Sequence, residues 1–565
     1  MIKIQYQTQH LSLRFFLLML ILFFFQVGFG LLIAAQQADP TLLSGSYFNF
    51  NIMRAEHTNL GILWILSGFI GTILFVGPLL SNRELASPWL IKFLFYALIA
   101  IVLWNVGTQT LAADGIAGWW LGQPWLHEGL EYLEAGRAAD IVILIGFSIL
   151  CYVVLRTFPP VRQWNEIHWG LGLGVTALTL VWIFGLFFIE RLDLSEYFRW
   201  YVVHYWVEGV WEVIHISLIG FLLVLMFKAE VKAVGYAVFW GITLVWLSGL
   251  IGNAHHYFWI GTPEFWQFWG SLFSALEPLP LIFCFWHIYL DAHQDKKPLE
   301  NAPAFYFILG SVILEQVGAG ILGFTMTFAL TNVWSHGTWV TPSHAHLALF
   351  GTFGMLGIAS AYYAIPIMRK VPSFDQGLGK LSFWLVFTGM LGMAFAFAIG
   401  GTVQVFTYRT LGLDWFGGDV FPAMQFFKVL VPIFGLVFAT GAGILIYDLL
   451  TMGYRTSSSP AAEPAPTAAY RPTPSTGWSS MLSRFEAGMW LMGMWIFGAV
   501  ITLGLLSFNL HSVQAGDPTL PYLLASIGYP GLLLITLFFV WRFLSSMNAR
   551  CTQPTPAPSS LATAT

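Results

Sequence analysis

Long apolar stretches recur along almost the whole of this sequence, and they constrain its fold more than any other feature. A bilayer-spanning helix needs about 20 mainly apolar residues, and we find fourteen stretches that meet this condition. Only 9% of the residues are charged, against about 25% in soluble domains, so we expect lipid to be the solvent. We therefore predict an all-α, polytopic membrane protein. The predicted spans are 13–35, 58–80, 89–112, 138–157, 168–189, 203–228, 232–254, 267–290, 305–332, 344–368, 379–407, 424–449, 487–508 and 520–545.

The segment after the twelfth span differs in composition from its neighbours. Residues 454–482 are rich in Pro, Ala, Ser and Thr, which favours a flexible linker. We predict a twelve-helix membrane core over 1–453, a two-helix appendix over 483–548 and a disordered tail over 549–565. The first span has a longer apolar run than the roughly 7–15 residues of a signal peptide, so we interpret it as a membrane helix.

The distribution of basic residues predicts the orientation, because Lys and Arg are retained on the cytoplasmic side. With the N-terminus in the cytoplasm, all but six of the 24 basic residues fall on that side. The context expected is a bacterial-type inner membrane. The six exceptions are Arg54, Arg137, Arg191, Arg199, Arg409 and Lys428.

Charge and cysteine usage exclude several classes of protein. The net charge is −4 and no long basic run occurs, which argues against a nucleic-acid partner. The three cysteines are Cys151, Cys284 and Cys551, and none forms a CxxC or CxxCH motif. This excludes a disulfide scaffold, a cysteine zinc site and covalently attached haem c.

Ionisable side chains inside membrane helices are costly and therefore indicate a function. The sixth span begins HYWVEGVWEVIH, with His204, Glu208 and Glu212 four residues apart. This spacing turns each residue by about 40° around a helix, so all three share one face. Taken alone, the trio could be a buried hydrogen-bonded group.

Further histidines occur at the ends of three other spans. His255 and His256 end the seventh span, and His57 begins the second, where a capping or interfacial role would also explain it. His344 and His346 begin the tenth span. Residues two apart point about 200° away from each other, so one helix could serve two separate metals.

The alternation of the spans brings these residues to one depth. Spans two, six and ten run inward and begin with histidine, whereas span seven runs outward and ends with its pair, so the group lies towards the outer face. Imidazoles and a carboxylate without thiolates favour iron or copper. Two imidazoles can ligate a six-coordinate haem, one leaves a haem with an open position, and three with a carboxylate suit a non-haem metal.

Several local strings resemble the haem-copper oxidase superfamily, and its nitric oxide reductase branch closely. The strings are RAEHTNL, EGLEYLE, VVHYWVEGVWE, AHHYFWIG, FSALEPLP and HGTWVTPSHAHL. The resemblance implies a haem-copper oxidase-like catalytic domain in which low-spin haem b and high-spin haem b3 lie beside a non-haem iron. It implies that His57 and His346 hold haem b, that His344 holds haem b3, and that His204, His255, His256 and Glu208 hold the iron.

The same resemblance implies roles for further carboxylates. Glu212 and Glu277 would carry protons to the site, and Glu131 would bind a calcium ion near the haem propionates. Leu130 stands where members of the branch commonly have Arg, a departure at the calcium site. The inner halves of spans six and eight offer few other protonatable groups besides His215 and His287, so we expect protons from the outer side.

The function implied is reduction of two NO to N2O and water, as part of denitrification in a respiratory chain. An oxygen-reducing oxidase with copper is the main alternative, but it needs a tyrosine either four residues after the first histidine of the sixth span, where this sequence has Glu208, or from the seventh span. There, Tyr236 lies at the cytoplasmic end, far from the histidines, and Tyr257 lies beyond the span, directly after His256. A non-catalytic haem protein is a weaker alternative, because it leaves the third cluster unexplained. Without a haem c or thiolate copper motif, the electron donor should be a separate subunit or protein, first a cytochrome c type, otherwise a copper protein or quinol.

Overall fold

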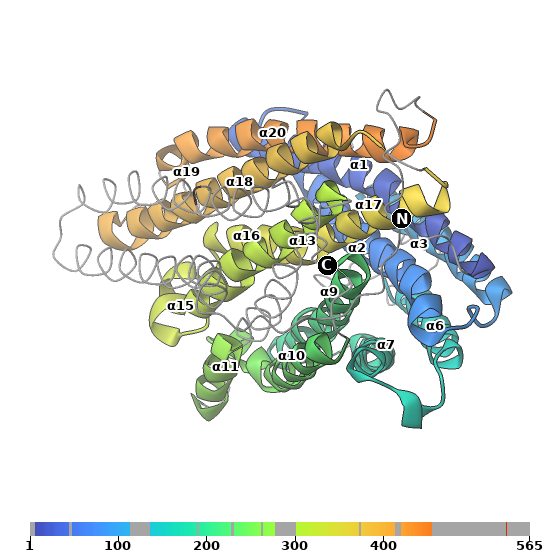
Figure 1. Ribbon diagram of the computed structural model, residues 1–565. Helices are drawn as coiled ribbons and strands as arrows, with labels where there is room; N and C mark the ends of the chain where they lie inside the picture. Colours follow the sequence, from blue (N-terminus) through green and yellow to red (C-terminus); the bar gives the residue numbers. More distant parts are fainter. Residues whose placement is uncertain are drawn as a thin grey trace, which may run out of the picture.

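The chain folds into a bundle of long helices (Figure 1). The structure is a computed structural model that describes residues 6–43, 48–113, 136–187, 191–227, 231–260, 264–276, 301–371, 374–412 and 420–454, with residues 189 and 538 besides. Within these residues every regular element is helical. The first half contains η1 (Gln7–His10), α1 (Leu11–Ala38), α2 (Phe50–Ser81), α3 (Pro88–Ala113), α6 (Arg137–Thr157), η2 (Val161–Gln163), α7 (Glu166–Gly185), α8 (Leu192–His204), η3 (Tyr205–Trp211), α9 (Glu212–Phe227), α10 (Val231–Gly252), η4 (Asn253–Tyr257) and α11 (Glu264–Leu276).

The second half of the described chain continues the bundle. Its elements are α13 (Ala302–Glu315), η5 (Gln316–Gly323), α14 (Phe324–Met326), α15 (Ala329–Ser335), α16 (Val340–Ala345), η6 (His346–Gly354), α17 (Met355–Met368), α18 (Gln376–Leu411), α19 (Val420–Ala423) and α20 (Gln425–Thr451). Three of the short elements, η3, η5 and η6, are π-helical and join α-helices without a break. Such widened turns are rare and occur often at functional sites.

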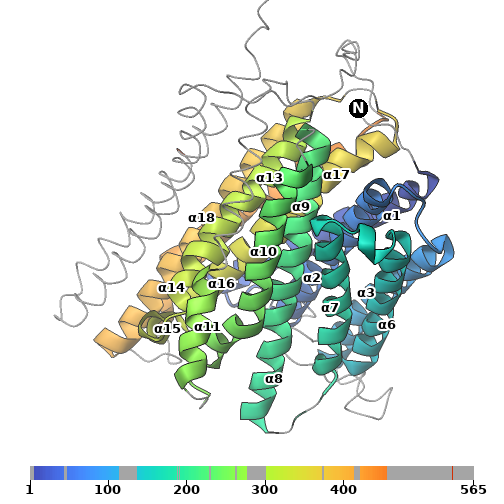
Figure 2. The ribbon, with the colours of Figure 1, turned by 60° about the horizontal axis from the view of Figure 1, so that its bottom comes forward.

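Neighbouring helices pack side by side around the bundle (Figure 2). Helices α1, α2, α3, α6, α7, α9, α10 and α11 each pack against the next in that order, while α18 packs against α20 and α20 packs against α1. At the centre of the bundle α2, α9 and α17 contact one another.

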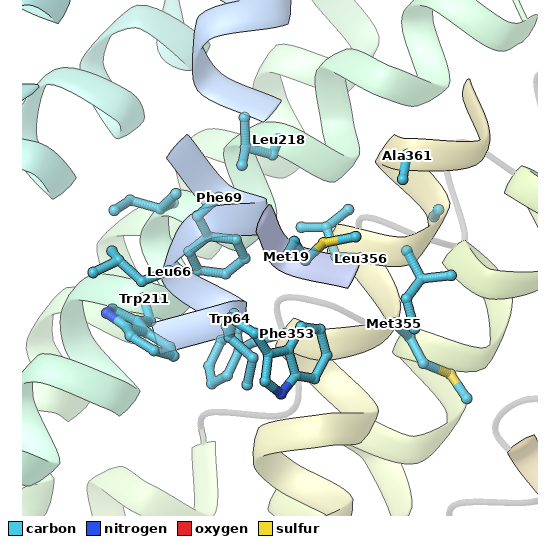
Figure 3. Packing of buried hydrophobic residues seen from close by; sticks show 14 of the residues in the cluster. Met19, Trp64, Leu66, Phe69, Trp211, Leu218, Phe353, Met355, Leu356 and Ala361 are labelled. Atoms are coloured by element: carbon cyan, nitrogen blue, oxygen red, sulfur yellow. The ribbon is translucent and has the colours of Figure 1, made fainter. Parts of the chain in front are cut away.

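Large apolar side chains fill the space between these central helices (Figure 3). Trp64 and Phe69 of α2 meet Trp211 of η3 and Phe353 of η6, and all four are fully buried. The apolar segment of Phe50–Ser81 is 89% buried within the protein, whereas that of Pro88–Gly107 is 33% buried. The central helices are thus shielded by protein, and the peripheral ones present apolar faces to their surroundings.

The predicted all-α membrane architecture is confirmed. Within the described residues, ten helices are long and apolar enough to cross a membrane. The count of fourteen remains a prediction, since the linker, the last two spans and most of the eighth lie outside the described residues.

Several helices begin earlier than the apolar stretches predict. The second predicted span starts at 58, but α2 starts at Phe50, where the Asn49 side chain accepts a hydrogen bond from the Ile52 amide. The helix containing His204 likewise starts at Leu192. His57 and His204 therefore lie inside helices rather than at their first turns. Hydropathy locates the apolar segment, whereas helical hydrogen bonding continues through the polar residues beyond it.

Candidate functional site

Four potential metal ligands converge in the interior of the bundle. His204 ends α8, Glu208 lies in η3, and His255 and His256 lie in η4, yet one ligand atom from each lies within 4.8 Å of the others. His204 Nε2 lies 2.8 Å from Glu208 Oε2, but this contact lacks hydrogen-bond geometry, and neither ring nitrogen of His204 has a hydrogen-bond partner. Buried polar atoms are normally satisfied, so a group this convergent fits a bound cation.

Glycines allow the helices that carry this cluster to approach closely. A Cβ added to Gly249 of α10 would lie 2.4 Å from the Cα of Gly209 in η3, so the two backbones touch. A Cβ added to Gly270 of α11 would lie 2.6 Å from the backbone nitrogen of His255. A larger side chain would push η3 away from α10 at Gly209 or Gly249, and η4 away from α11 at Gly270. The cluster therefore depends on these three glycines.

Neighbouring side chains orient the imidazoles of the pair in η4. The Nδ1 atom of His255 lies 2.7 Å from the hydroxyl of Ser274 on α11. The indole of Trp200 stacks on the ring of His256, with centroids 4.2 Å apart and an interplanar angle of 6°. Fixing one ring nitrogen and the ring plane leaves the other nitrogen aimed at the cluster, as is usual for histidines that bind metals.

A second pair of histidines faces across the bundle from α2 and η6. The ring centroids of His57 and His346 are 5.9 Å apart and their planes are inclined by 29°. Nδ1 of His57 lies 3.0 Å from the backbone oxygen of Gln26, and Nδ1 of His346 lies 2.7 Å from that of Pro342. In each ring an Nδ1–H that donates to a carbonyl makes Nε2 the potential metal ligand. The Gln26 side chain also lies 3.3 Å from Nε2 of His57.

His344 lies on the other side of the helix from His346. Its Nδ1 lies 2.8 Å from the backbone oxygen of Gly318 in η5, the same arrangement as in the other pair. It interacts electrostatically with His255 and His256, so it belongs to the surroundings of the metal-ligand cluster. The predicted opposite facing of His344 and His346 therefore matches the two different neighbourhoods in which they lie.

Of the remaining predicted carboxylates, only Glu212 lies within the described residues. Glu212 follows η3 and is buried, with 4% of its surface exposed. Glu131 and Glu277 lie outside the described residues. The calcium site and one of the two expected proton carriers are therefore not described.

Sequence reasoning missed several residues around the site. Gln26 and Ser274 contact the candidate ligands His57 and His255. Glu315, at the end of α13, is buried near Glu212. Glu315 is an ionisable residue inside a predicted span, and the rule that singled out Glu208 applies to it equally. No sequence signal of that kind exists for Gln26 and Ser274, which act through contacts between different helices.

Known proteins share this sequence pattern and fold. Residues 10–437 match the family model described as cytochrome c and quinol oxidase polypeptide I. A nitric oxide reductase subunit of Stutzerimonas stutzeri is 30% identical over 411 residues, covering 72% of this chain and 86% of the relative. A cytochrome c oxidase subunit 1 homolog of Agrobacterium tumefaciens (strain T37) is 24% identical over 460 residues, covering 75% and 80%. A heme-copper terminal oxidase solved as a dimer by cryo-EM has a TM-score of 0.63 at 14% identity, covering 86% of this chain and 91% of its own.

Proposed function

The chain belongs to the cytochrome c and quinol oxidase polypeptide I family of haem-copper oxidoreductases, and on that premise we propose that it is the catalytic subunit of a nitric oxide reductase. It would reduce two NO to N2O and water with two electrons and two protons. The relative from Stutzerimonas stutzeri, which is named as a nitric oxide reductase subunit, supports this choice within the family.

One observation carries the proposal, namely the carboxylate of Glu208 among three imidazoles. Its Oε2 lies 2.8 Å from His204 Nε2, inside the group that also contains His255 and His256. A carboxylate is a hard ligand, and three histidines with one carboxylate suit iron better than copper. A non-haem iron in place of copper is what the resemblance to the nitric oxide reductase branch implies.

The residues present also fit two haems. We propose that His57 and His346 would hold a low-spin haem b, because each has a backbone carbonyl at Nδ1 and its ring faces the other at 5.9 Å. His344 would hold haem b3, next to the iron ligands. When bound, the haem and the iron would supply electron transfer and catalysis by proximity and charge stabilisation.

The protein's own contribution is to keep the site dry and to deliver protons. Trp206 and Trp211 of η3 are buried, and Glu212 lies four residues after Glu208. We propose that Glu212 and Glu277 pass protons to the site from the outer side of a bacterial inner membrane. A carboxyl group can do this because it takes up a proton from one partner and gives it to another.

Reduction of oxygen is the second candidate, favoured by the relative that is named as a cytochrome c oxidase subunit 1 homolog. Oxygen reduction in this superfamily needs a tyrosine bonded to a ligand histidine. Glu208 occupies one of the possible positions. Tyr257 follows His256, but its ring stacks on that of Tyr197 at 4.4 Å and its hydroxyl lies 3.4 Å from the Tyr197 backbone oxygen. Nitric oxide reduction is therefore the better supported reaction.

The electron donor and the calcium ion complete the proposal. The name of the Stutzerimonas stutzeri relative marks it as one subunit of its enzyme, which is consistent with a separate donor subunit, and we expect a cytochrome c type before a copper protein or quinol. Glu131 would contribute to a calcium site.

The test is to purify the protein, quantify haem, iron and copper, and measure gas turnover with an artificial reductant. We expect two b-type haems and one further iron per chain, and consumption of NO with formation of N2O. One copper per chain without the third iron, together with faster turnover of oxygen, would overturn the proposal in favour of the oxidase.

A further inference from the structure

A second pair of titratable residues lies buried next to the proposed active site. His215 of α9 is 0% exposed and Glu315, the last residue of α13, is 4% exposed. His215 Nδ1 and Glu315 Oε2 are 3.7 Å apart, and neither atom has a hydrogen-bond partner. Two unsatisfied polar atoms facing each other in an apolar interior are expensive, so the pair requires an explanation.

The hydrogen bonds on the other side of His215 define its tautomer. The Ser311 hydroxyl donates to the Thr352 backbone oxygen at 2.6 Å, so its only hydrogen is used. Ser311 Oγ must then accept from His215 Nε2, which lies 2.9 Å away. A neutral His215 with its hydrogen on Nε2 presents a lone pair at Nδ1 towards Glu315.

This arrangement requires a proton between His215 and Glu315. A lone pair on Nδ1 and an ionised carboxylate would repel each other, whereas a protonated carboxyl can donate to Nδ1 after a small rotation. The separation of 3.7 Å is just beyond hydrogen-bond length, so such a rotation closes the contact. The edge of Phe353 packs against the His215 ring at 5.6 Å and holds the imidazole in place.

The pair adjoins the redox site through α9. Glu212 lies three residues before His215, about 4.5 Å along the helix axis, and it interacts electrostatically with both Glu315 and Glu208. Glu315 also stands at the point where α13 passes into the π-helical η5, whose Gly318 carbonyl contacts His344. The pair is thus next to Glu212, and Glu315 lies three residues before the Gly318 that contacts His344.

We propose that Glu315 and His215 form a proton reservoir, which holds one exchangeable proton inside the membrane and releases it towards Glu212 when the redox site is reduced. The proton resides on Glu315 Oε2 in the resting state. Its departure leaves a carboxylate, whose negative charge faces His215 Nδ1, and a proton arriving along the same route restores the carboxyl. The electrons come from the external donor, so the proposal rests on the proposed function for the use of the proton.

The experiment is infrared difference spectroscopy of the purified holoenzyme, reduced minus oxidised, in H2O and in D2O. A protonated Glu315 should give a carboxyl C=O band that changes on reduction and shifts in D2O. Glu315→Gln should remove this band while retaining both haems and the iron. It should also slow turnover on the order of tenfold, less than the 10²–10⁴ that a general acid contributes, without slowing haem reduction.

Asp448→Asn is the matched control, because Asp448 of α20 is fully buried and accepts a hydrogen bond from the Tyr362 hydroxyl at 3.1 Å. This variant should leave the redox-sensitive band in place. If the Glu315→Gln variant loses its haems, the His215→Gln variant provides the test instead. Gln at this position keeps a donor towards Ser311 but removes the basic Nδ1 that faces Glu315. The Glu315 band should then move to the frequency of a less strongly hydrogen-bonded carboxyl.

An unchanged redox-sensitive carboxyl band in Glu315→Gln, or in His215→Gln where the first variant does not assemble, would overturn the reservoir. The spectra depend on reduction of the metal centres and not on the gas that is consumed. A failure to reduce NO would therefore count against the proposed function alone, and the two proposals can fail separately.

Discussion

The two histidine centres of this protein are built in different ways. Around His57 and His346, a backbone carbonyl lies at each Nδ1 and the two rings face each other. In the cluster of His204, His255, His256 and Glu208, four ligand atoms crowd together and His204 lacks hydrogen bonds at both ring nitrogens. The first centre is held in place by backbone carbonyls, whereas the second brings together side chains whose convergence fits the cation that we propose.

The largest effect should come from removing, one at a time, the proposed haem ligands His346 of η6 and His344 of α16. We expect His346→Ala to abolish the low-spin haem spectrum while much of the high-spin signal remains, and His344→Ala to do the reverse, because the two rings face different neighbours. Both variants should lose nearly all activity. Optical and magnetic spectra of the purified variants provide the measurement; loss of one common signal in both would contradict the separation.

Glu212→Gln should affect the cluster that contains Glu208 and leave the pair of His57 and His346 unchanged. An amide keeps the shape of the buried side chain but cannot relay a proton by ionising, so turnover should fall by about 10²-fold or more. Electron entry at the pair of His57 and His346 should be unaffected. Stopped-flow haem reduction and steady-state turnover test this, and equal slowing of both would show that the residue is structural.

Ser274→Ala tests how much the cluster depends on its surroundings. The Ser274 hydroxyl orients His255 through Nδ1, and loss of such a partner typically weakens metal affinity by about 10–100-fold. We expect a corresponding loss of iron on dialysis against a chelator, with unchanged haem content. Ser271→Ala on the same helix is the control, because that hydroxyl bonds to backbone oxygens of Gln267 and Thr327; equal iron loss there would contradict the role of Ser274.

Gly30→Ala should disturb the first centre by a smaller amount. A Cβ at Gly30 would lie 2.7 Å from Cε1 of His57, so the ring or α1 must move. We expect a shifted low-spin haem spectrum and a changed midpoint potential, with iron content unchanged. Gly28→Ala on the same helix meets nothing within 4 Å and should leave the spectrum as it is. A normal spectrum in both variants would mean that α1 does not support His57.

The smallest effect should come from a carboxylate far from both centres. Glu84 is exposed, and the slight desolvation that would raise its pKa is outweighed by hydrogen bonds from the Thr8 hydroxyl and from the Thr8 and Gln7 amides, which lower the pKa from its ordinary value. A lowered pKa adds stability above the unfolded-state value, and this is lost as pH falls through the folded-state value. Glu84→Gln should therefore lower thermal stability at neutral pH by under about 1 kcal/mol, with the difference from the wild type vanishing in acid and both metal centres intact.

Much of the candidate site could be predicted because its residues are expensive in a membrane. Histidines and carboxylates inside apolar spans stand out, and the alternation of spans predicted that they lie at one depth. The resemblance implied that His204, His255 and His256 share a metal. Glu315 was equally visible but had no second His, Asp or Glu at helical spacing in its span to draw attention to it. Its partner His215 became meaningful only when α9 and α13 were seen to bring the two within 3.7 Å.

The order of amino acids was enough to establish that this chain is a bundle of membrane helices and which side chains its interior must accommodate. Hydropathy is a local property, so each membrane span can be recognised from its own residues. The packed bundle was needed to show that Gly209 and Gly249 touch, that Gln26 supports His57, and that the Gly318 carbonyl of η5 lies against His344. These features depend on distances between residues far apart in the chain, and such distances are fixed only when all the helices have packed.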